Sequence, residues 1–546
     1  MADSKGPNGG VPGLAVARAM LATASGKKKL DLLLSSADAK GFVRSLPAED
    51  LYFAVRDIGL ADAAEVVELA SPGQFRAFVD LDAWERDQVD PSRVLAWLRL
   101  ALEGGPEGLR RKRKGLDSEL LVLLLKTQTI IHELEEGVDP VLTSDNWVTT
   151  AERKYIVEIT AEGDDGLTTR RLVEDFIDES PFEATRLFEA VRWELQSELE
   201  ETGARWRRGR LRDMGFPEFE EALRIWRPLE AGWKPRAQAP GVGHVAGVPA
   251  LLLAGSRRQL FLDQVAAKLP DDARGSFNEG LVYLLNCAIV ADGVEPRELE
   301  LARTSVGAAR DQLSLGLELA SDGDETRALA VLLSTPPVEL FRLAVTRLAE
   351  LQKEANAAAR PLLFGQGGQL ALDPPDAETL AGLRRKRPRL FDAGQWRPLR
   401  DRLDIQRAEE AIARARLAAA VLGSLEVTVT RASGLAEQAG RAPTAVTASQ
   451  LSLTAAVREA LGLGSLEPLS PEELTRLPSL FAGEKLTALA RARLERFFDE
   501  RAPQASAVTR EWIDRLEAEV GPPVARGELD PRFVEAVLVL PAAERA

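Results

Sequence analysis

One spacing pattern recurs four times between Asp38 and Asp82, and it constrains the fold more than any other feature of the chain. Each copy follows the i, i+3, i+4, i+7 spacing of a helix that buries one face. Each copy also starts twelve residues after the previous one, which would rotate the buried face of a continuous helix by about 120°. The helix must therefore break between copies. The equivalent positions of the four copies are Val43, Val55, Val67 and Val79.

Helix-breaking residues stand where this pattern needs them. Pro47 begins the second copy, Gly59 ends it, and Pro72 opens the fourth. We therefore expect a stack of short antiparallel helices, with the four valines facing one continuous core.

The rest of the chain also favours helix. Ala, Leu, Glu and Arg dominate, and residues that favour sheets are scarce. The exception follows Asn146, where Val148, Tyr155, Val157 and Ile159 indicate one or two strands. The expected fold is mainly α, a superhelical stack of short antiparallel helices with a small α+β unit near the middle.

A chain of 546 residues is long for one core, and Gly- and Pro-rich stretches suggest where it divides. The nominal dinucleotide-binding spacing at Gly241, Gly243 and Ala246 follows no strand, so a linker is favoured there. The expected segments are a flexible arm with a short helix (1–30), a helical superhelix (31–145), a small α+β unit (146–235), a linker (236–250), a helical domain (251–360), a second linker (361–395) and a C-terminal helical domain (396–546).

Charge and hydropathy narrow the range of partners and locations. The formal net charge of −15 argues against general binding of nucleic acids or anionic membranes, because both would repel the chain. The longest apolar runs fall far short of the ~20 residues that a membrane-spanning helix needs. No secretory signal is evident at the start of the chain. We expect a soluble, cytoplasmic protein.

The residues that most often carry catalysis are few. Cys287 is the one cysteine, and its apolar surroundings predict a buried, inert thiol. The two histidines, His132 and His244, are too few for a His-rich metal site within one chain. His132 lacks the second histidine of a zinc-binding helix, and we expect it at a solvated helix position. The sequence predicts no catalytic, cofactor-binding or metal-binding residue.

The repeat region carries the first resemblance to a known family. The stretch from Leu46 to Asp82 reads LPAEDLYFAVRDIGLADAAEVVELASPGQFRAFVDLD. It resembles the cytosolic amino-terminal domain of MgtE-type magnesium transporters, a superhelix of short helices. The resemblance covers less than a tenth of the chain and implies the fold alone.

A second resemblance is more specific. The segment from Leu195 to Leu223 reads LQSELEETGARWRRGRLRDMGFPEFEEAL, and the segment from Leu313 to Ala344 reads LSLGLELASDGDETRALAVLLSTPPVELFRLA. Both resemble segments of an uncharacterised bacterial family, a domain of unknown function. With the repeat region they cover much of residues 30–400. The resemblance implies no activity and no site residue.

Basic runs stand out against the acidic whole, and one of them lies in the first of these segments. Clustered arginines suit phosphate or an acidic partner, but they also pair with carboxylates of their own chain, and the second alternative is favoured. A structural corner is also expected nearby, where Gly215 ends a helix and Phe216 and Phe219 pack inward. The best candidates for a binding surface are Arg207, Arg208, Arg210 and Arg212.

These observations favour a non-catalytic interaction or scaffold protein of unknown pathway that binds one or more protein partners. A superhelix exposes long concave surfaces that suit such partners. The alternative is an enzyme or ligand-binding regulator that uses carboxylates and arginines on a phosphorylated small molecule. A site of that kind has no fixed spacing in sequence, so the alternative stays open.

Overall fold

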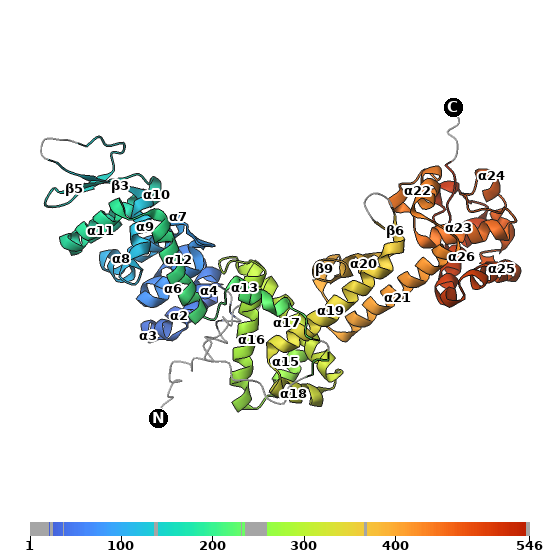
Figure 1. The fold of residues 1–546 in the computed structure, drawn as a ribbon, viewed down its shortest axis with the longest axis horizontal. Coiled ribbons are helices and arrows are strands. Elements are labelled where there is room, and N and C mark those ends of the chain that lie inside the picture. The colour runs from blue at the N-terminus through green and yellow to red at the C-terminus, as the bar shows by residue number, and fades with distance from the viewer. Residues whose placement is uncertain are drawn as a thin grey trace, which may run out of the picture. The chain divides into compact units, whose positions relative to one another are not determined.

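The protein is mainly α-helical, with antiparallel sheets of only two or three strands (Figure 1). The computed structural model describes residues 21, 24, 26–36, 38–135, 140–230, 232–234, 259–364 and 369–541. The chain divides into two compact units, one up to Arg342 and one from Leu343 onward. His244 and the glycine spacing at 241–246 lie outside the described residues.

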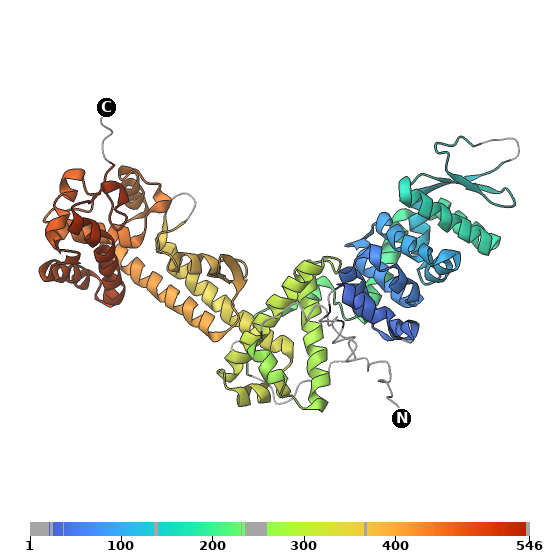
Figure 2. The same cartoon turned by 180° about the vertical axis from the view of Figure 1, so that it is seen from behind.

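The first unit begins with the predicted stack of short helices, seen from both sides in Figures 1 and 2. Helices two apart in the chain pack on each other: α2 on α4, α3 on α5, α4 on α6, and α5 on α7. Val43, Val55, Val67 and Val79 are all fully buried, which confirms the predicted core. The helices are α2 (Gly26–Leu34), α3 (Ala39–Ser45), α4 (Ala48–Ile58), α5 (Ala64–Leu69), α6 (Pro72–Asp82) and α7 (Pro91–Glu103).

The helix ends of the stack are closed by local hydrogen bonds. Gly59 ends α4 with a φ of 103°, a conformation that favours glycine. Ser71 and Gln74 form a capping box at the start of α6. The Gln74 amide also donates to the carbonyls of Val43 and Leu46, 2.9 and 2.8 Å away. Because the last carbonyls of a helix lack partners within it, this one side chain ties the end of α3 to α6.

A three-stranded antiparallel sheet follows the stack. β4 (Trp147–Thr149) and β5 (Tyr155–Ile159) confirm the predicted strands, and β5 lies between β4 and β3 (Thr129–Glu133). The helices around them are α8 (Gly105–Arg113), α9 (Ser118–Gln128), α10 (Gly163–Glu179), α11 (Pro181–Trp193) and α12 (Gln196–Asp213), and a two-stranded ribbon of β1 (Trp84–Glu85) and β2 (Gln88–Val89) precedes them.

The prediction for His132 is wrong. His132 lies in β3 and not in a helix, opposite Ile156 of β5. Thr129, Ile130 and Ile131 favour a strand, and β5 offers a partner 26 residues along the chain. Its Nε2 atom lies 2.8 Å from a carboxylate oxygen of Glu158, so the ring is engaged within the protein.

The first unit ends with a further set of helices. Asp322 adopts a left-handed conformation between two of them, and the Asp324 side chain caps the next. Cys287 is fully buried, and burial raises the pKa of its thiol to about 12, as expected of an inert thiol. The helices are α13 (Phe219–Ala222), α15 (Phe261–Ala266), α16 (Asp271–Ala291), α17 (Leu299–Ser321), α18 (Glu325–Ser334) and the start of α19 (Pro337–Ala359).

The second unit is also helical, and its described residues form three short hairpins. Much of the segment expected as a linker at 361–395 is folded, because it contains α20 (Asp376–Leu383) and the hairpin of β8 (Arg389–Asp392) and β9 (Gln395–Pro398). Ser470 and Glu473 form a capping box at the start of the short helix Pro471–Leu474. The other main helices are α21 (Arg402–Ser424), α22 (Val429–Gln438), α23 (Ala448–Ala460), α25 (Ala488–Arg501) and α26 (Ser506–Arg526), and the remaining hairpins are β6 (Leu363–Phe364) with β7 (Gln369–Leu370) and β10 (Phe481–Ala482) with β11 (Lys485–Leu486).

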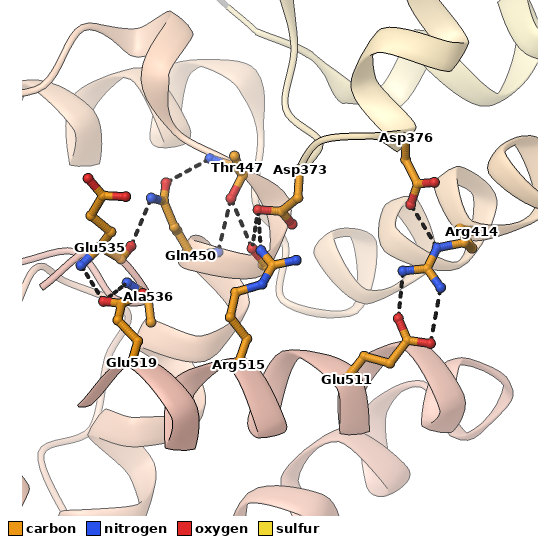
Figure 3. Close-up of polar contacts among 11 residues, drawn as sticks. Asp373, Asp376, Arg414, Thr447, Gln450, Glu511, Arg515, Glu519, Glu535 and Ala536 are labelled. Carbon is orange, nitrogen blue, oxygen red and sulfur yellow. Dashed lines mark hydrogen bonds and ion pairs between the residues drawn. The ribbon is translucent and has the colours of Figure 1, made fainter. Parts of the chain in front are cut away.

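Three side chains four residues apart on α26 hold the second unit together (Figure 3). Glu511 forms a bidentate pair with Arg414 of α21, at 2.6 and 3.0 Å. Arg515 pairs with Asp373 at 2.6 Å, and Glu519 accepts the backbone N–H groups of residues 535 and 536. Each of these three side chains thus has a partner within the unit, so together they act as a structural clamp.

No single helix in the described part of the chain is both long and apolar enough to cross a membrane. The pair Glu325–Ser334 and Pro337–Leu362 meets the same test of length and composition, but it is bent by 119°.

Candidate functional site

The arginine run of α12 is divided by the helix itself, because successive residues of a helix point in different directions. Arg207 points inward, with 7% of its surface exposed. Its Nε donates to the backbone carbonyl of Asp80 at 2.8 Å, and one terminal nitrogen donates to that of Arg86 at 3.1 Å. The guanidinium also lies over the Trp84 ring, 5.5 Å from its centre. Arg207 therefore joins α12 to the end of α6 and the β1–β2 ribbon.

Arg210 lies one turn further along and meets two carboxylates. Its guanidinium holds Asp80 with two hydrogen bonds, of 2.6 and 2.9 Å, and pairs with Asp117 at 2.7 Å. Burial raises the pKa of the Asp80 carboxyl, and the charges of Arg210 and Arg207 oppose that shift. Removing Arg210 would leave the buried Asp80 carboxylate without its hydrogen-bonded partner.

The other two arginines of the run point outward. Arg208 is exposed and donates to the Ala204 carbonyl of its own helix. Arg212 is exposed and lies 3.5 Å from Glu221. If α12 binds an acidic partner, Arg208 and Arg212 are the members of the run available to it. Binding by the run stays a prediction.

The corner expected after α12 is confirmed in part. Gly215 has a φ of 84° just beyond the helix, and Phe216 is buried. Phe219 was expected to pack inward, but 54% of it is exposed at the start of α13.

A second candidate site in the first unit is the edge of β3 that faces away from β5. Backbone hydrogen bonds from Leu134 to Lys154 and from Thr160 to Gln128 fix which residues of β3 face β5. Residues of an antiparallel strand alternate between pairing with the neighbour and pointing away from it. No strand of the described residues pairs along the other side of β3. The residues whose N–H and C=O groups point to that free side are Thr129, Ile131 and Glu133.

A hollow of about 500 Å³ lies along this free edge, between β3 and the connection from α11 to α12. We call it the β3 groove. Trp193 forms part of its wall with 72% of the side chain exposed, and Ile130 is 44% exposed. The residues that define it here are Lys126, Ile130, Ile131, Val191, Arg192 and Trp193.

The β3 groove carries positive charge. Arg192 is partly neutralised, because it pairs with Glu133 at 2.7 Å. The Lys126 ammonium donates to the Val191 carbonyl at 2.7 Å, and no carboxylate of the described residues pairs with it. A chain with a net charge of −15 thus presents, beside an exposed tryptophan, an ammonium that no carboxylate of the described residues neutralises.

The opposite face of the same sheet is closed by a buried carboxylate. Glu158 is fully buried and accepts hydrogen bonds from the backbone N–H groups of Thr143 and Ser144, at 2.5 and 2.6 Å. The Thr143 hydroxyl and His132 also bind it, at 2.7 and 2.8 Å. The hydroxyl of Thr143, with the other donors, lowers the pKa of Glu158 to about 2. Glu158 thus remains an anion that fastens the 143–144 segment to the sheet.

The sequence offered only a weak signal for the β3 groove. Trp193 and Lys126 are 67 positions apart, and nothing in their local sequence places them together. The β-branched run at Thr129, Ile130 and Ile131 was the available sign of a strand. Within the described residues, no group of three His, Cys, Asp or Glu side chains is placed to hold a metal ion.

Comparisons with known proteins give one match. No curated protein and no solved structure matches the chain. No comparison supports the resemblance to MgtE-type transporters. A family model matches residues 12–540 and supports the second resemblance, so the chain belongs to a family of unknown function (DUF6178).

Proposed function

We propose that this is a non-catalytic cytoplasmic interaction or scaffold protein, and that the β3 groove is where it binds a protein partner. The observation that carries the proposal is the exposed Trp193 beside a strand edge that no strand of the described residues pairs with. Exposed aromatic side chains in grooves are the usual anchors of protein interfaces. The helical stack and the clamp of α26 supply rigid frameworks on which such surfaces can be presented.

The alternative, a carboxylate–arginine site for a phosphorylated small molecule, gains no support from the arginine run. Arg207 donates to backbone carbonyls and Arg210 holds the Asp80 carboxylate, so both guanidiniums are engaged within the fold. A phosphate would have to displace a carboxylate that is almost completely buried. The second unit shows the same pattern, since Arg414 is held by both Asp376 and Glu511.

The test is an affinity purification with quantitative mass spectrometry from cells that express the protein. Trp193→Ala is the test variant, and Trp206→Ala is the matched control, because Trp206 is also an exposed tryptophan of the first unit. We expect at least one protein to be recovered with the wild type and the control and to be lost with Trp193→Ala. Equal recovery with all three would contradict the proposal.

A thermal scan separates the two classes of function. An interaction protein should keep its melting temperature when nucleotides or divalent metal ions are added. A ligand at about 100 times its dissociation constant would add about 2.7 kcal/mol of stability, which a scan detects. A reproducible rise with any of these additives would favour the alternative.

A further inference from the structure

The free side of β3 offers backbone groups in the arrangement that another strand would use. Thr129, Ile131 and Glu133 direct their N–H and C=O groups away from β5. Thr129 is only 6% exposed, so the accessible edge runs from Ile130 to Glu133, a span of about 10 Å that suits a partner strand of about four residues. An unpaired strand edge is a template for a further strand, and many peptide-binding domains use one in this way.

The side chains of the β3 groove place apolar surface on both faces of that strand edge. Trp193 and Val191 lie beside it on the helical side, and Ile130 flanks it on the other face. An extended peptide alternates its side chains between two faces, so a peptide on β3 would meet apolar surface on both. Apolar, β-branched residues suit such a position.

The distribution of charge along the groove predicts the orientation of a bound peptide. Lys126 precedes the strand and lies at the Thr129 end, without a carboxylate partner among the described residues. Glu133 lies at the other end. A carboxylate on the occupant would meet Lys126 favourably, whereas the cation at the other end, Arg192, is already paired with Glu133. A peptide whose carboxyl end lies beside Thr129 runs antiparallel to β3.

We propose that the β3 groove binds an extended, apolar peptide segment that pairs antiparallel with β3 and places a carboxylate against Lys126. This inference rests on the proposed function, and it specifies the chemical class of the protein segment that the groove binds. The carboxylate comes from a chain terminus or from an acidic side chain, and the experiment separates these sources.

The probes are fluorescent pentapeptides of alternating valine and threonine, and the full-length protein is titrated with them by fluorescence anisotropy. One peptide ends in a free carboxylate, one in an amide, one in a glutamate amide and one in a lysine amide. We expect the free acid, the glutamate amide or both to bind at least roughly tenfold more tightly than the neutral and lysine-ended amides. Binding of the free acid alone indicates a chain terminus, and equal binding of both acids indicates any carboxylate. Equal binding of all four, or of none, overturns the proposal.

Strand pairing itself is tested by backbone N-methylation of the tightest peptide. Methylating one alternate set of its nitrogens removes the N–H groups that face β3, and methylating the other set leaves them intact. We expect one set to abolish binding and the other to preserve it. Equal loss in both sets, or in neither, contradicts pairing with a strand.

Two substitutions connect the binding to the groove. Lys126→Met should remove the preference for a carboxylate, and Trp193→Ala should weaken all peptides, while Trp206→Ala should change neither. Circular dichroism and a urea melt establish that each variant is folded. If Lys126→Met keeps the preference, the carboxylate does not meet Lys126 and the proposal is wrong.

The experiments distinguish failure of the peptide-binding proposal from failure of the proposed function. If Trp193→Ala loses a native partner but no peptide binds, the groove is an interface for a folded surface, and strand pairing is overturned. If sedimentation shows that the wild type self-associates and Trp193→Ala does not, the edge is occupied by a second copy of this chain. That result also overturns the peptide proposal.

Discussion

The α12 arginines and the β3 groove are both cationic parts of the first unit, but they differ in what surrounds the charge. Arg207 and Arg210 are held by Asp80, Asp117 and backbone carbonyls. Lys126 lies in an open hollow without a carboxylate partner among the described residues. Two of the four candidate arginines of α12 are thus engaged in contacts within the fold, while the charge of the single Lys126 is available to a binding partner. The state of pairing, and not the number of cations, distinguishes a structural site from a candidate for binding.

The largest effect is expected where the α12 contact is broken. Arg210→Gln leaves Asp80, 1% exposed, without its bidentate partner. An uncompensated buried charge costs about 3–5 kcal/mol, and we expect the lower end because Arg210 itself is partly exposed. A urea melt at neutral pH measures the loss. A decrease of less than about 1 kcal/mol would show that this contact is not structural.

A smaller effect is expected at the closed face of the sheet that carries the groove. The folded pKa of Glu158 is about 2, below its ordinary value of 4.5, so the unfolded chain takes up the proton first as the pH falls. The contribution of the Glu158 carboxylate to folding stability is therefore complete above pH 4.5 and is lost as the pH falls toward 2.

Glu158→Gln provides the comparison, because the amide keeps the size but not the charge of the side chain. We expect the wild type to be more stable at neutral pH and the two urea midpoints to converge in acid. A difference that stays constant across this range would mean that the Glu158 charge does not fasten the loop.

Trp193→Ala tests the open region and should affect binding much more than stability. An exposed side chain is usually worth within about 0.5 kcal/mol of folding stability. A central aromatic anchor of an interface is worth about 2 kcal/mol or more of binding. Urea melts and peptide titrations of the same samples measure both quantities. A marked loss of folding stability would show that Trp193 stabilises the fold, as Arg207 and Arg210 do, and is not primarily a binding residue.

The helical stack could be predicted because its signals are local. Gly59 and Pro72 each act within one or two turns, and both stand at helix ends in the fold. The division of the arginine run could not be predicted. Pairing with carboxylates of the same chain was expected, but the partner of Arg210 is Asp80, 130 residues away, which no local pattern indicates.

The β3 edge was missed for a related physical reason. The strand follows α9 directly at Thr129, with no glycine or proline between them, so the apolar helix pattern runs on into it. Only pairing with β5 makes the segment a strand and sets His132 against Glu158. The hollow then depends on α11, which brings Trp193 to the edge from far along the chain. No local pattern encodes a contact of that kind.

The smallest effect is expected for the outward members of the arginine run, and it sharpens the comparison most. Arg208→Gln and Arg212→Gln remove two exposed charges, whose contacts in the fold are a long hydrogen bond to Ala204 and a distant pair with Glu221. Exposed pairs contribute little, so the double variant should keep its stability within about 0.5 kcal/mol. It should also bind the peptides as the wild type does, because neither arginine lines the β3 groove. A native partner that is lost from this variant, in a manner that added salt reproduces, would show that the outward half of α12 is a second binding surface. In that case the α12 helix would be structural on one side and functional on the other.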